Sequence, residues 1–145
     1  MSVAYKKDIV AWANEQAAYI RAGRFDMLDL ENIAEEIEDV GKSEQRELES
    51  RMAVLIAHLL KWQYQPTHRG VSWERTIKAQ RKMVQKRVKQ TPSLKASLLD
   101  TEWIDDAWTD ATIQASKETG IELIKFPEVC PWTMEQVLDD EFFPD

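Results

Sequence analysis

The sequence has few residues that break helices and few that form crosslinks or bind metals. It contains four glycines and five prolines among 145 residues, which disfavours a fold rich in turns and hairpins. A single cysteine, Cys130, excludes an internal disulfide and is consistent with a reducing compartment. The two histidines, His58 and His68, belong to no histidine–glutamate metal motif. The composition therefore predicts a helical protein that is not held together by disulfides.

Long hydrophobic runs are also missing. The longest purely aliphatic run has five residues, 53–57, whereas a membrane-spanning helix needs about 20. No positively charged leader with an apolar core precedes a small-residue cleavage site. We therefore expect no membrane association and a cytoplasmic location. Hydrophobic residues at 43% and charged residues at 31% are typical of a globular protein, and the length fits one domain, 1–145.

Motifs of cofactor-binding and hydrolytic enzymes are absent from the sequence. It has no glycine-rich phosphate loop and no nucleophile elbow, so we expect no cofactor. Cys130 lies between Val129 and Pro131 with no adjacent cation or histidine, which favours a packed thiol over a nucleophile. The sequence thus leans against an enzyme.

The dominant positive signal is a helical repeat of apolar residues in the middle of the chain. The segment Ala53–Pro66 and the residues before it carry apolar side chains around more than a third of a helix circumference. These residues are Leu48, Met52, Leu55, Ile56, Leu59, Leu60 and Trp62. Such a wide apolar arc predicts the central helix of a bundle. We expect an all-α, compact up-and-down bundle of four to five main helices with a short C-terminal capping helix.

Periodicity and capping residues predict the helix boundaries. The expected helices are 3–22, 30–40 ending at Gly41, 43–65 capped by Ser43, 73–90 capped by Ser72, 93–120, and a short one to 139 opened by Thr133 and Gln136. Whether helix 93–120 continues through Asp100 is left open by its pattern. Helix 30–40 is expected to bury its apolar stripe, which consists of Leu30, Ile33, Ala34, Ile37 and Val40. Phe142 and Phe143 are expected to dock against the bundle.

Charge is segregated along the chain, although the net charge is only −7. Residues 29–49 contain nine acidic and two basic side chains, whereas residues 61–90 contain nine basic side chains and one acidic one. Five cations recur at i, i+3, i+7, i+11 and i+14 on one face of helix 73–90. They are Arg75, Lys78, Lys82, Lys86 and Lys89. We call these five residues the basic ridge; it is about 20 Å long at the rise of an α-helix.

The basic ridge is the best candidate for a partner-binding surface. Cations on one helical face attract an acidic protein surface or a polyanion. Overall acidity, with a pI near 4.9, and the absence of aromatic residues or glycines among the cations disfavour nucleic acid. The first hypothesis is therefore a non-enzymatic interaction or regulatory module that binds a protein partner or forms a homo-oligomer through the acidic helix (29–49) and the basic helix (72–90).

A second hypothesis concerns His58, at the edge of the central apolar arc. An imidazole there, together with Glu36 or Asp39, would suit a small metal-dependent or histidine-based hydrolase. The simpler interpretation is a neutral core histidine with hydrogen-bonded nitrogens, because buried polar groups are usually paired for structural reasons. Both hypotheses stay open on the sequence alone. The spacing of the three residues does not identify a metal site.

Several blocks of the sequence resemble a bacterial family common in cyanobacteria and proteobacteria. The blocks are residues 28–33, 35–41, 58–66, 72–73 and 130–132, which read LDLENI, EEIEDVG, HLLKWQYQP, SW and CPW. The family is domain-of-unknown-function family twenty-nine, and the resemblance extends from Tyr5 to Pro144. It implies a small all-α protein. It supplies no activity, cofactor or catalytic residue.

Overall fold

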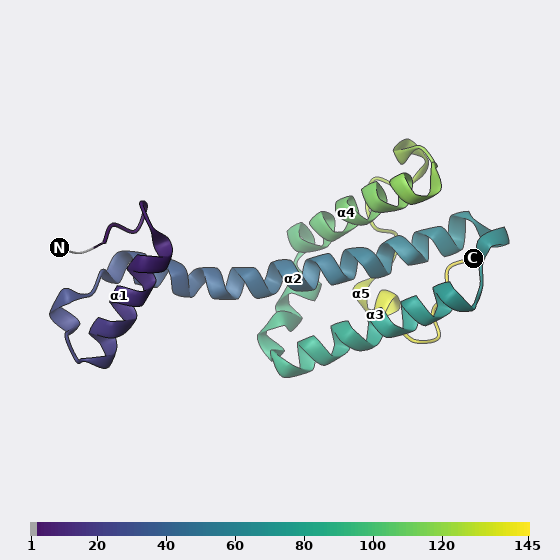
Figure 1. Cartoon of the computed structure of the whole chain (residues 1–145). Coiled ribbons are helices and arrows are strands. Elements are labelled where there is room, and N and C mark those ends of the chain that lie inside the picture. Colours follow the sequence, from purple (N-terminus) through teal and green to yellow (C-terminus); the bar gives the residue numbers. More distant parts are fainter. Residues whose placement is uncertain (1–2) are drawn as a thin grey trace. The chain divides into compact units, whose positions relative to one another are not determined.

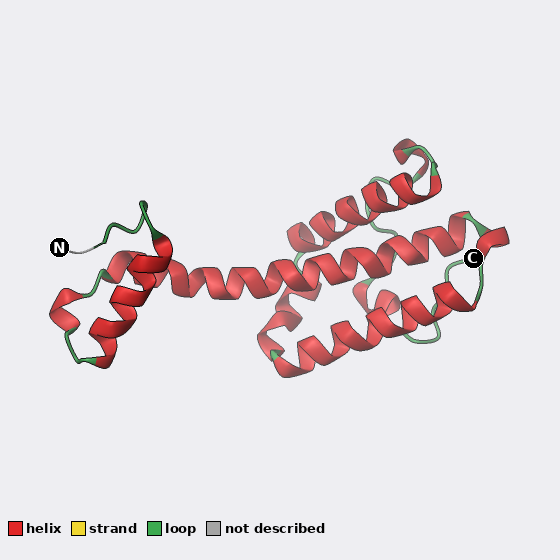
Figure 2. Cartoon of the chain, viewed as in Figure 1, coloured by secondary structure: helices red, strands yellow, loops and turns green. Residues whose placement is uncertain are grey.

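The structure is a computed structural model that describes residues 3–145, and every regular element in that range is helical (Figure 2). The α-helices are α1 (Ile9–Arg21), α2 (Leu30–Tyr64), α3 (Val71–Gln90), α4 (Thr101–Thr119) and α5 (Met134–Leu138), labelled in Figure 1. Short 3-10 helices lie at Phe25–Met27, Pro66–His68, Pro92–Leu99 and Leu123–Lys125. The expected all-α bundle is confirmed.

The chain divides into two compact units, Met1–Ser43 and Glu44–Asp145, and α2 contributes residues to both. Each unit is described separately below. The single domain 1–145 that the chain length suggests stays a prediction.

The first unit is a helical hairpin of α1 and the first turns of α2. Gly23, with φ of 72°, lies one residue beyond the C-cap of α1 and turns the chain there. Asp29 caps α2 by accepting a hydrogen bond from the Asn32 amide. A polar clasp joins the helices, because Trp12 Nε1 donates to Asp29 at 3.0 Å and Asp29 N donates to Gln16 at 2.8 Å.

The predicted break between two helices at Gly41 is wrong, since α2 continues unbroken from Leu30 to Tyr64. Gly41 does not adopt the left-handed conformation that would end a helix, and Ser43 lies inside the helix instead of capping a new one. A glycine inside a helix costs only about 1 kcal/mol relative to alanine, which the residues around it can offset.

The expected burial of the 30–40 stripe is also wrong. Leu30, Ile37 and Val40 are each about two-thirds exposed and Ala34 is exposed, while Ile33 is half-buried. The residues of this segment that are half-buried on the side of the polar clasp are largely polar, among them Asn32, Glu36 and Asp39. The hairpin is therefore held by polar contacts and by the buried Trp12, whose ring packs on Tyr5 with centroids 4.8 Å apart, and its apolar stripe remains at the surface.

The second unit contains the hydrophobic core, and the second half of α2 runs through it. Leu48, Met52, Leu55, Ile56 and Leu59 are all fully buried, which confirms the predicted central segment. In Figure 1, α3 and α4 run along the two sides of this half of α2. The core residues that these helices and the C-terminal segment add are Ile77, Val84, Val88, Trp103, Ala107, Trp108, Ala111, Ala115, Phe126, Met134 and Val137.

The remaining boundaries differ from the predictions in detail. Helix α1 begins at Ile9, because Asp8 caps it through the Ala11 amide, so residues 3–8 are not helical. Helix α3 begins at Val71 with Gly70 as N-cap, so Ser72 is not the cap. The region 93–120 is interrupted: a 3-10 helix ends before Asp100, and Asp100 caps α4 through the Glu102 amide.

The C-terminal segment docks on the second unit through aromatic residues and one buried arginine. Phe143 packs on Trp62 and Phe142 on Trp132, with ring centroids 4.9 and 5.9 Å apart, which confirms their predicted docking. Arg81 of α3 is almost fully buried, and its guanidinium donates hydrogen bonds only to backbone carbonyls of this segment. The predicted capping box of Thr133 and Gln136 opens α5.

None of the helices described within residues 3–145 is both long enough and apolar enough to cross a bilayer.

Candidate functional site

The basic ridge lies on the outer face of α3. Ile77, Val84 and Val88 of the same helix are buried in the core, so the opposite face is turned outward. All five ridge residues are exposed. In the part of the chain that the structure describes, none of the five takes part in an ion pair. Their positive charge is thus available to a partner.

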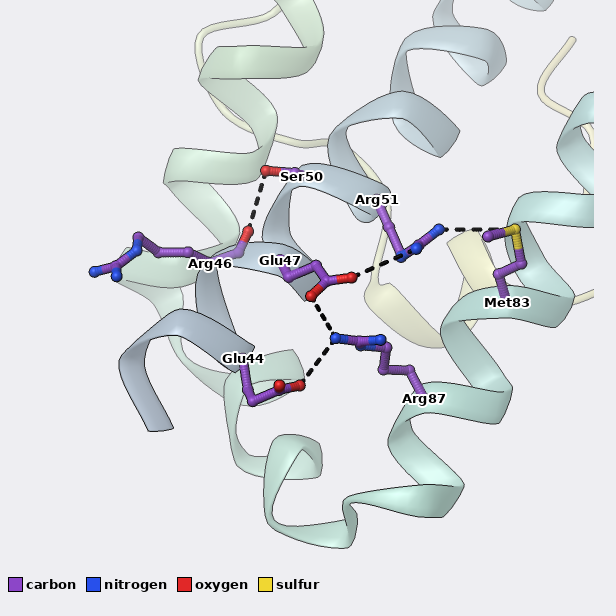
Figure 3. A network of polar contacts seen from close by, with 7 residues as sticks. All are labelled: Glu44, Arg46, Glu47, Ser50, Arg51, Met83 and Arg87. Atoms are coloured by element: carbon purple, nitrogen blue, oxygen red, sulfur yellow. Dashed lines mark hydrogen bonds and ion pairs between the residues drawn. The ribbon is translucent and has the colours of Figure 1, made fainter. Parts of the chain in front are cut away.

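The other two cations of α3 have structural contacts, which sets them apart from the ridge. Arg81 is the buried anchor of the C-terminal segment. Arg87 is half-buried and donates to the carboxylates of Glu44 and Glu47 on α2, with an Nη2–Oε2 distance of 2.9 Å to Glu44 (Figure 3). The seven cations of α3 therefore fall into two groups, two that are bonded within the fold and five that are exposed.

The same close-up shows how Arg51 joins this network. Arg51 Nη2 donates to Glu47 at 3.4 Å, and Nη1 approaches the sulfur of Met83 at 3.8 Å (Figure 3). Glu47 thereby accepts from Arg51 and Arg87 at once. Part of the acidic segment 29–49 is therefore paired within the second unit and is not a free acidic face.

In the first unit, the Tyr5 hydroxyl donates a hydrogen bond to Glu36. This bond and the neighbouring carboxylates raise the pKa of Tyr5 to about 12, because ionisation would place a second negative charge beside Glu36. Asp39 is half-buried in the same unit. Both carboxylates of the hydrolase hypothesis thus lie in the hairpin.

His58 belongs to the second unit, 19 positions after Asp39 on the same helix. Its Nδ1 lies 2.9 Å from the carbonyl of Val54, which can only accept, so Nδ1 carries the proton and Nε2 has the lone pair. Burial lowers the pKa of His58, which keeps the ring neutral. A protein bond to one nitrogen agrees with the structural interpretation, whereas Nε2 has no partner among the described residues.

An ion pair lies next to His58. Lys61 Nζ donates to Glu118 of α4 at 2.8 Å and also lies 5.5 Å from the centroid of the Trp73 ring. The bond from Lys61 lowers the pKa of Glu118. Between residues 3 and 145, no group of three or more His, Cys, Asp or Glu side chains is arranged to hold a metal ion.

Cys130 is half-buried, and its thiol donates to the carbonyl of Trp132 with an S–O distance of 3.3 Å. Burial raises its pKa, which lowers the fraction of thiolate at neutral pH. The environment suits a packed thiol.

Glu49 carries the most perturbed carboxyl group of the second unit. Its Oε1 atom is buried without a hydrogen-bond partner in the described structure, and Asp106 and Asp110 of α4 face it. Burial and these two carboxylates raise the pKa of Glu49 to about 7. The ordinary value is 4.5, so folding raises the proton affinity of this group.

We expect Glu49 to make the second unit less stable as the pH rises. Below about pH 4.5 the group is protonated in both states, and between 4.5 and about 7 the unfolded chain releases its proton first, so the free energy of unfolding falls. The shift alone would correspond to about 3 kcal/mol, and solvent screening at this half-exposed group reduces the expected loss to about 1 kcal/mol. Glu49→Gln should remove that loss, measured by urea unfolding at pH 5 and pH 8.

The matched control is Glu128→Gln, which removes one negative charge at an exposed loop position. It should keep the pH dependence of the unmodified protein. Equal pH dependence of the free energy of unfolding in Glu49→Gln and the unmodified protein would contradict a raised pKa of Glu49.

Sequence reasoning missed three residues of these networks: Arg81, Arg87 and Glu49. Arg81 lies four residues after Ile77 and seven before Val88, on the apolar face of the helix. A cation at such a position indicates a buried arginine, and this pattern could have identified it. The roles of Arg87 and Glu49 depend on which helix faces them, and periodicity within one helix carries no information about that.

Comparison with known proteins adds a family. The family model described as Domain of unknown function DUF29 matches residues 4–143. No curated protein and no solved structure matches the chain.

Proposed function

The chain belongs to the DUF29 family, and from that premise we propose that it is a non-enzymatic protein-interaction module whose basic ridge binds an acidic surface of a partner protein. The observation that supports this most strongly is the division among the cations of α3. Two of seven have structural partners, and the five that share one face are exposed and outside any ion pair in residues 3–145.

The basic ridge contributes little to the stability of the fold, which favours a role in binding. Unpaired cations on one face repel each other and contribute little to folding, since even paired surface charges are worth only about 0–1 kcal/mol. The same five charges spaced along one helical face steer and orient an acidic partner. The polar network in Figure 3 fixes α3 against α2 and so presents the ridge on a rigid support.

The test is charge reversal in the ridge. We expect Lys78→Glu with Lys82→Glu to leave the unfolding temperature unchanged, because both side chains are exposed. The double variant should lose the partner in affinity capture from the native host, and capture by the unmodified protein should weaken as salt is raised, because exposed charges are screened.

Lys95→Glu with Lys117→Glu is the matched control, since it makes the same change of charge at exposed positions outside the ridge. The control should retain the captured protein. Equal recovery by both double variants would remove the ridge as the binding surface.

A further inference from the structure

The hairpin of the first unit exposes an unusual amount of apolar surface. Eight of the fifteen large hydrophobic side chains that are exposed in residues 3–145 lie in this unit, which holds fewer than a third of those residues. Only Trp12 and Gln16 are buried within it. A helical pair with so small an interior is marginal by itself, because the area buried on folding is what offsets the entropy of the ordered chain.

Apolar side chains, most of them exposed, lie on one face of each helix. On α1 they follow the spacing i, i+4, i+8 and i+11, and on α2 they follow i, i+3, i+7 and i+10, so each set lies on one face. We call this surface the hairpin stripe; it consists of Ile9, Ala13, Ala17, Ile20, Leu30, Ile33, Ile37 and Val40. Most of these residues line a shallow groove between α1 and α2, together with Trp12, Gln16 and Glu36.

Hydrogen bonds of the polar clasp, together with the bond from Tyr5, hold α1 against α2. Trp12 Nε1 donates to Asp29, Asp29 N donates to Gln16, and the Tyr5 hydroxyl donates to Glu36, so these contacts fix the two helices at their shared face. Two stripe residues, Ala17 and Ile33, are half-buried, whereas the other six are exposed and contribute little to closing the hairpin. The stripe is free to pack against something else.

We propose that the hairpin stripe binds the same stripe of a second copy of the chain, and that two hairpins form a four-helix bundle. Two antiparallel helices with one apolar side are half of such a bundle, and an isologous pairing covers both stripes at once. This inference goes beyond the proposed function, because it concerns the first unit and a second copy of the chain and does not involve the basic ridge.

Charge sets the arrangement of the two copies, since each hairpin is acidic overall and its acidic excess lies on α2. Residues 3–27 carry four basic and three acidic side chains, whereas residues 29–43 carry one basic and six acidic ones. In a bundle of two hairpins each α2 can lie beside its own α1 and the α1 of the other copy. The two acidic α2 segments are then on the diagonal, where their repulsion is weakest and each faces a helix that contains cations.

The area of the stripe indicates how large an interface two copies can form. Its five most exposed side chains are 46–67% exposed. If a fully exposed side chain offers roughly 100 Å² of apolar area, the five together present about 300 Å². Since somewhat more than half of an interface is apolar, each copy would bury about 500–600 Å², below the standard size of about 800 Å². Interfaces of this small size are typical of weak, transient association, so we expect dimerisation in the micromolar range.

Sedimentation equilibrium of the full chain from about 1 to about 200 μM tests the proposal over the range in which such a dimer forms. The unmodified protein should pass from monomer to dimer. Ile37→Glu with Val40→Glu places charges in the stripe at exposed positions and should weaken dimerisation by at least about 100-fold, with unchanged helix content by circular dichroism. Leu99→Glu with Ile124→Glu makes the same change at apolar positions of the second unit and should dimerise normally.

Crosslinking supplies a second measurement that does not depend on charged substitutions. In a Cys130→Ser background, Ala17→Cys places a single thiol in the stripe, and Ala79→Cys places one on the exposed face of α3. A bismaleimide should join two copies of the Ala17→Cys protein and leave the Ala79→Cys protein uncrosslinked. A chain that stays monomeric over the whole range would overturn the proposal and leave the stripe to a different protein. Dimerisation unaffected by Ile37→Glu with Val40→Glu, or equal crosslinking of both thiols, would also overturn it.

Discussion

Replacing Arg81 with methionine is expected to lower the free energy of unfolding of the second unit by about 3–5 kcal/mol. The guanidinium is 1% exposed and donates to the carbonyls of Val137, Asp140 and Phe142. Methionine keeps the apolar stem and removes every donor, so these carbonyls lose charge-assisted bonds in a place that water cannot easily reach. The contact of the guanidinium with the Phe143 ring, at 5.3 Å, is lost as well.

The measurement is thermal unfolding followed by circular dichroism, where a loss of this size should lower the midpoint by about 15 °C. Arg75→Met removes the same charge from an exposed position of the same helix and should change the stability by less than about 0.5 kcal/mol. Burial also lowers the pKa of Arg81, because desolvation disfavours the charged guanidinium. If Arg81→Met and Arg75→Met unfolded at the same temperature, the carbonyl contacts would not be what holds the C-terminal segment.

Limited proteolysis separates loss of the anchor from general destabilisation. In Arg81→Met the segment after α5 should be cleaved first, at temperatures where the core remains folded, because Phe142 and Phe143 depend on the anchored backbone for their places on Trp132 and Trp62. Arg81→Lys should lie between the two methionine variants, since a lysine ammonium cannot serve three divergent carbonyls.

How far the sequence predicts this structure depends on whether a pattern is local to one helix. The apolar arc around Leu55 and Leu59 identified the central helix, and the Thr133–Gln136 pair identified α5, because both signals lie within a few turns of one segment. Asp100 separates two segments whose apolar stripes do not align, and the structure has a cap there. Each of these features can be read without knowing what packs against it.

The failures came from features that depend on neighbours. Gly41 has the residue type of a helix end, but only the surroundings decide whether a glycine ends a helix, and here α2 passes through it. Leu30, Ile37 and Val40 have the spacing of a buried stripe, but periodicity cannot tell a core from an uncovered binding surface. For the candidate site, the spacing of the ridge placed its five cations on one face, whereas the pairing of Arg87 required the fold.

The second large effect is expected from Leu59→Ala, in the middle of the buried part of α2. Leu59 is completely buried and belongs to the cluster that includes α3, α4 and the C-terminal segment. Truncation removes the transfer free energy of the side chain and leaves a cavity that these elements cannot easily fill, because α4 already approaches with small residues such as Ala107 and Ala111. The expected loss is about 3–4 kcal/mol.

Leu99→Ala is the matched control, because the same atoms are removed from a side chain that is 86% exposed in the same unit. It should change the free energy of unfolding by less than about 0.5 kcal/mol. Urea unfolding at pH 5 is the measurement, because ionised Glu49 then contributes little to destabilisation. Both variants should show the same dependence of the free energy of unfolding on urea concentration. Similar midpoints for the two alanine variants would mean that the second half of α2 is not the centre of the core. The support that holds α3 and its ridge in place would then have to be sought in other contacts.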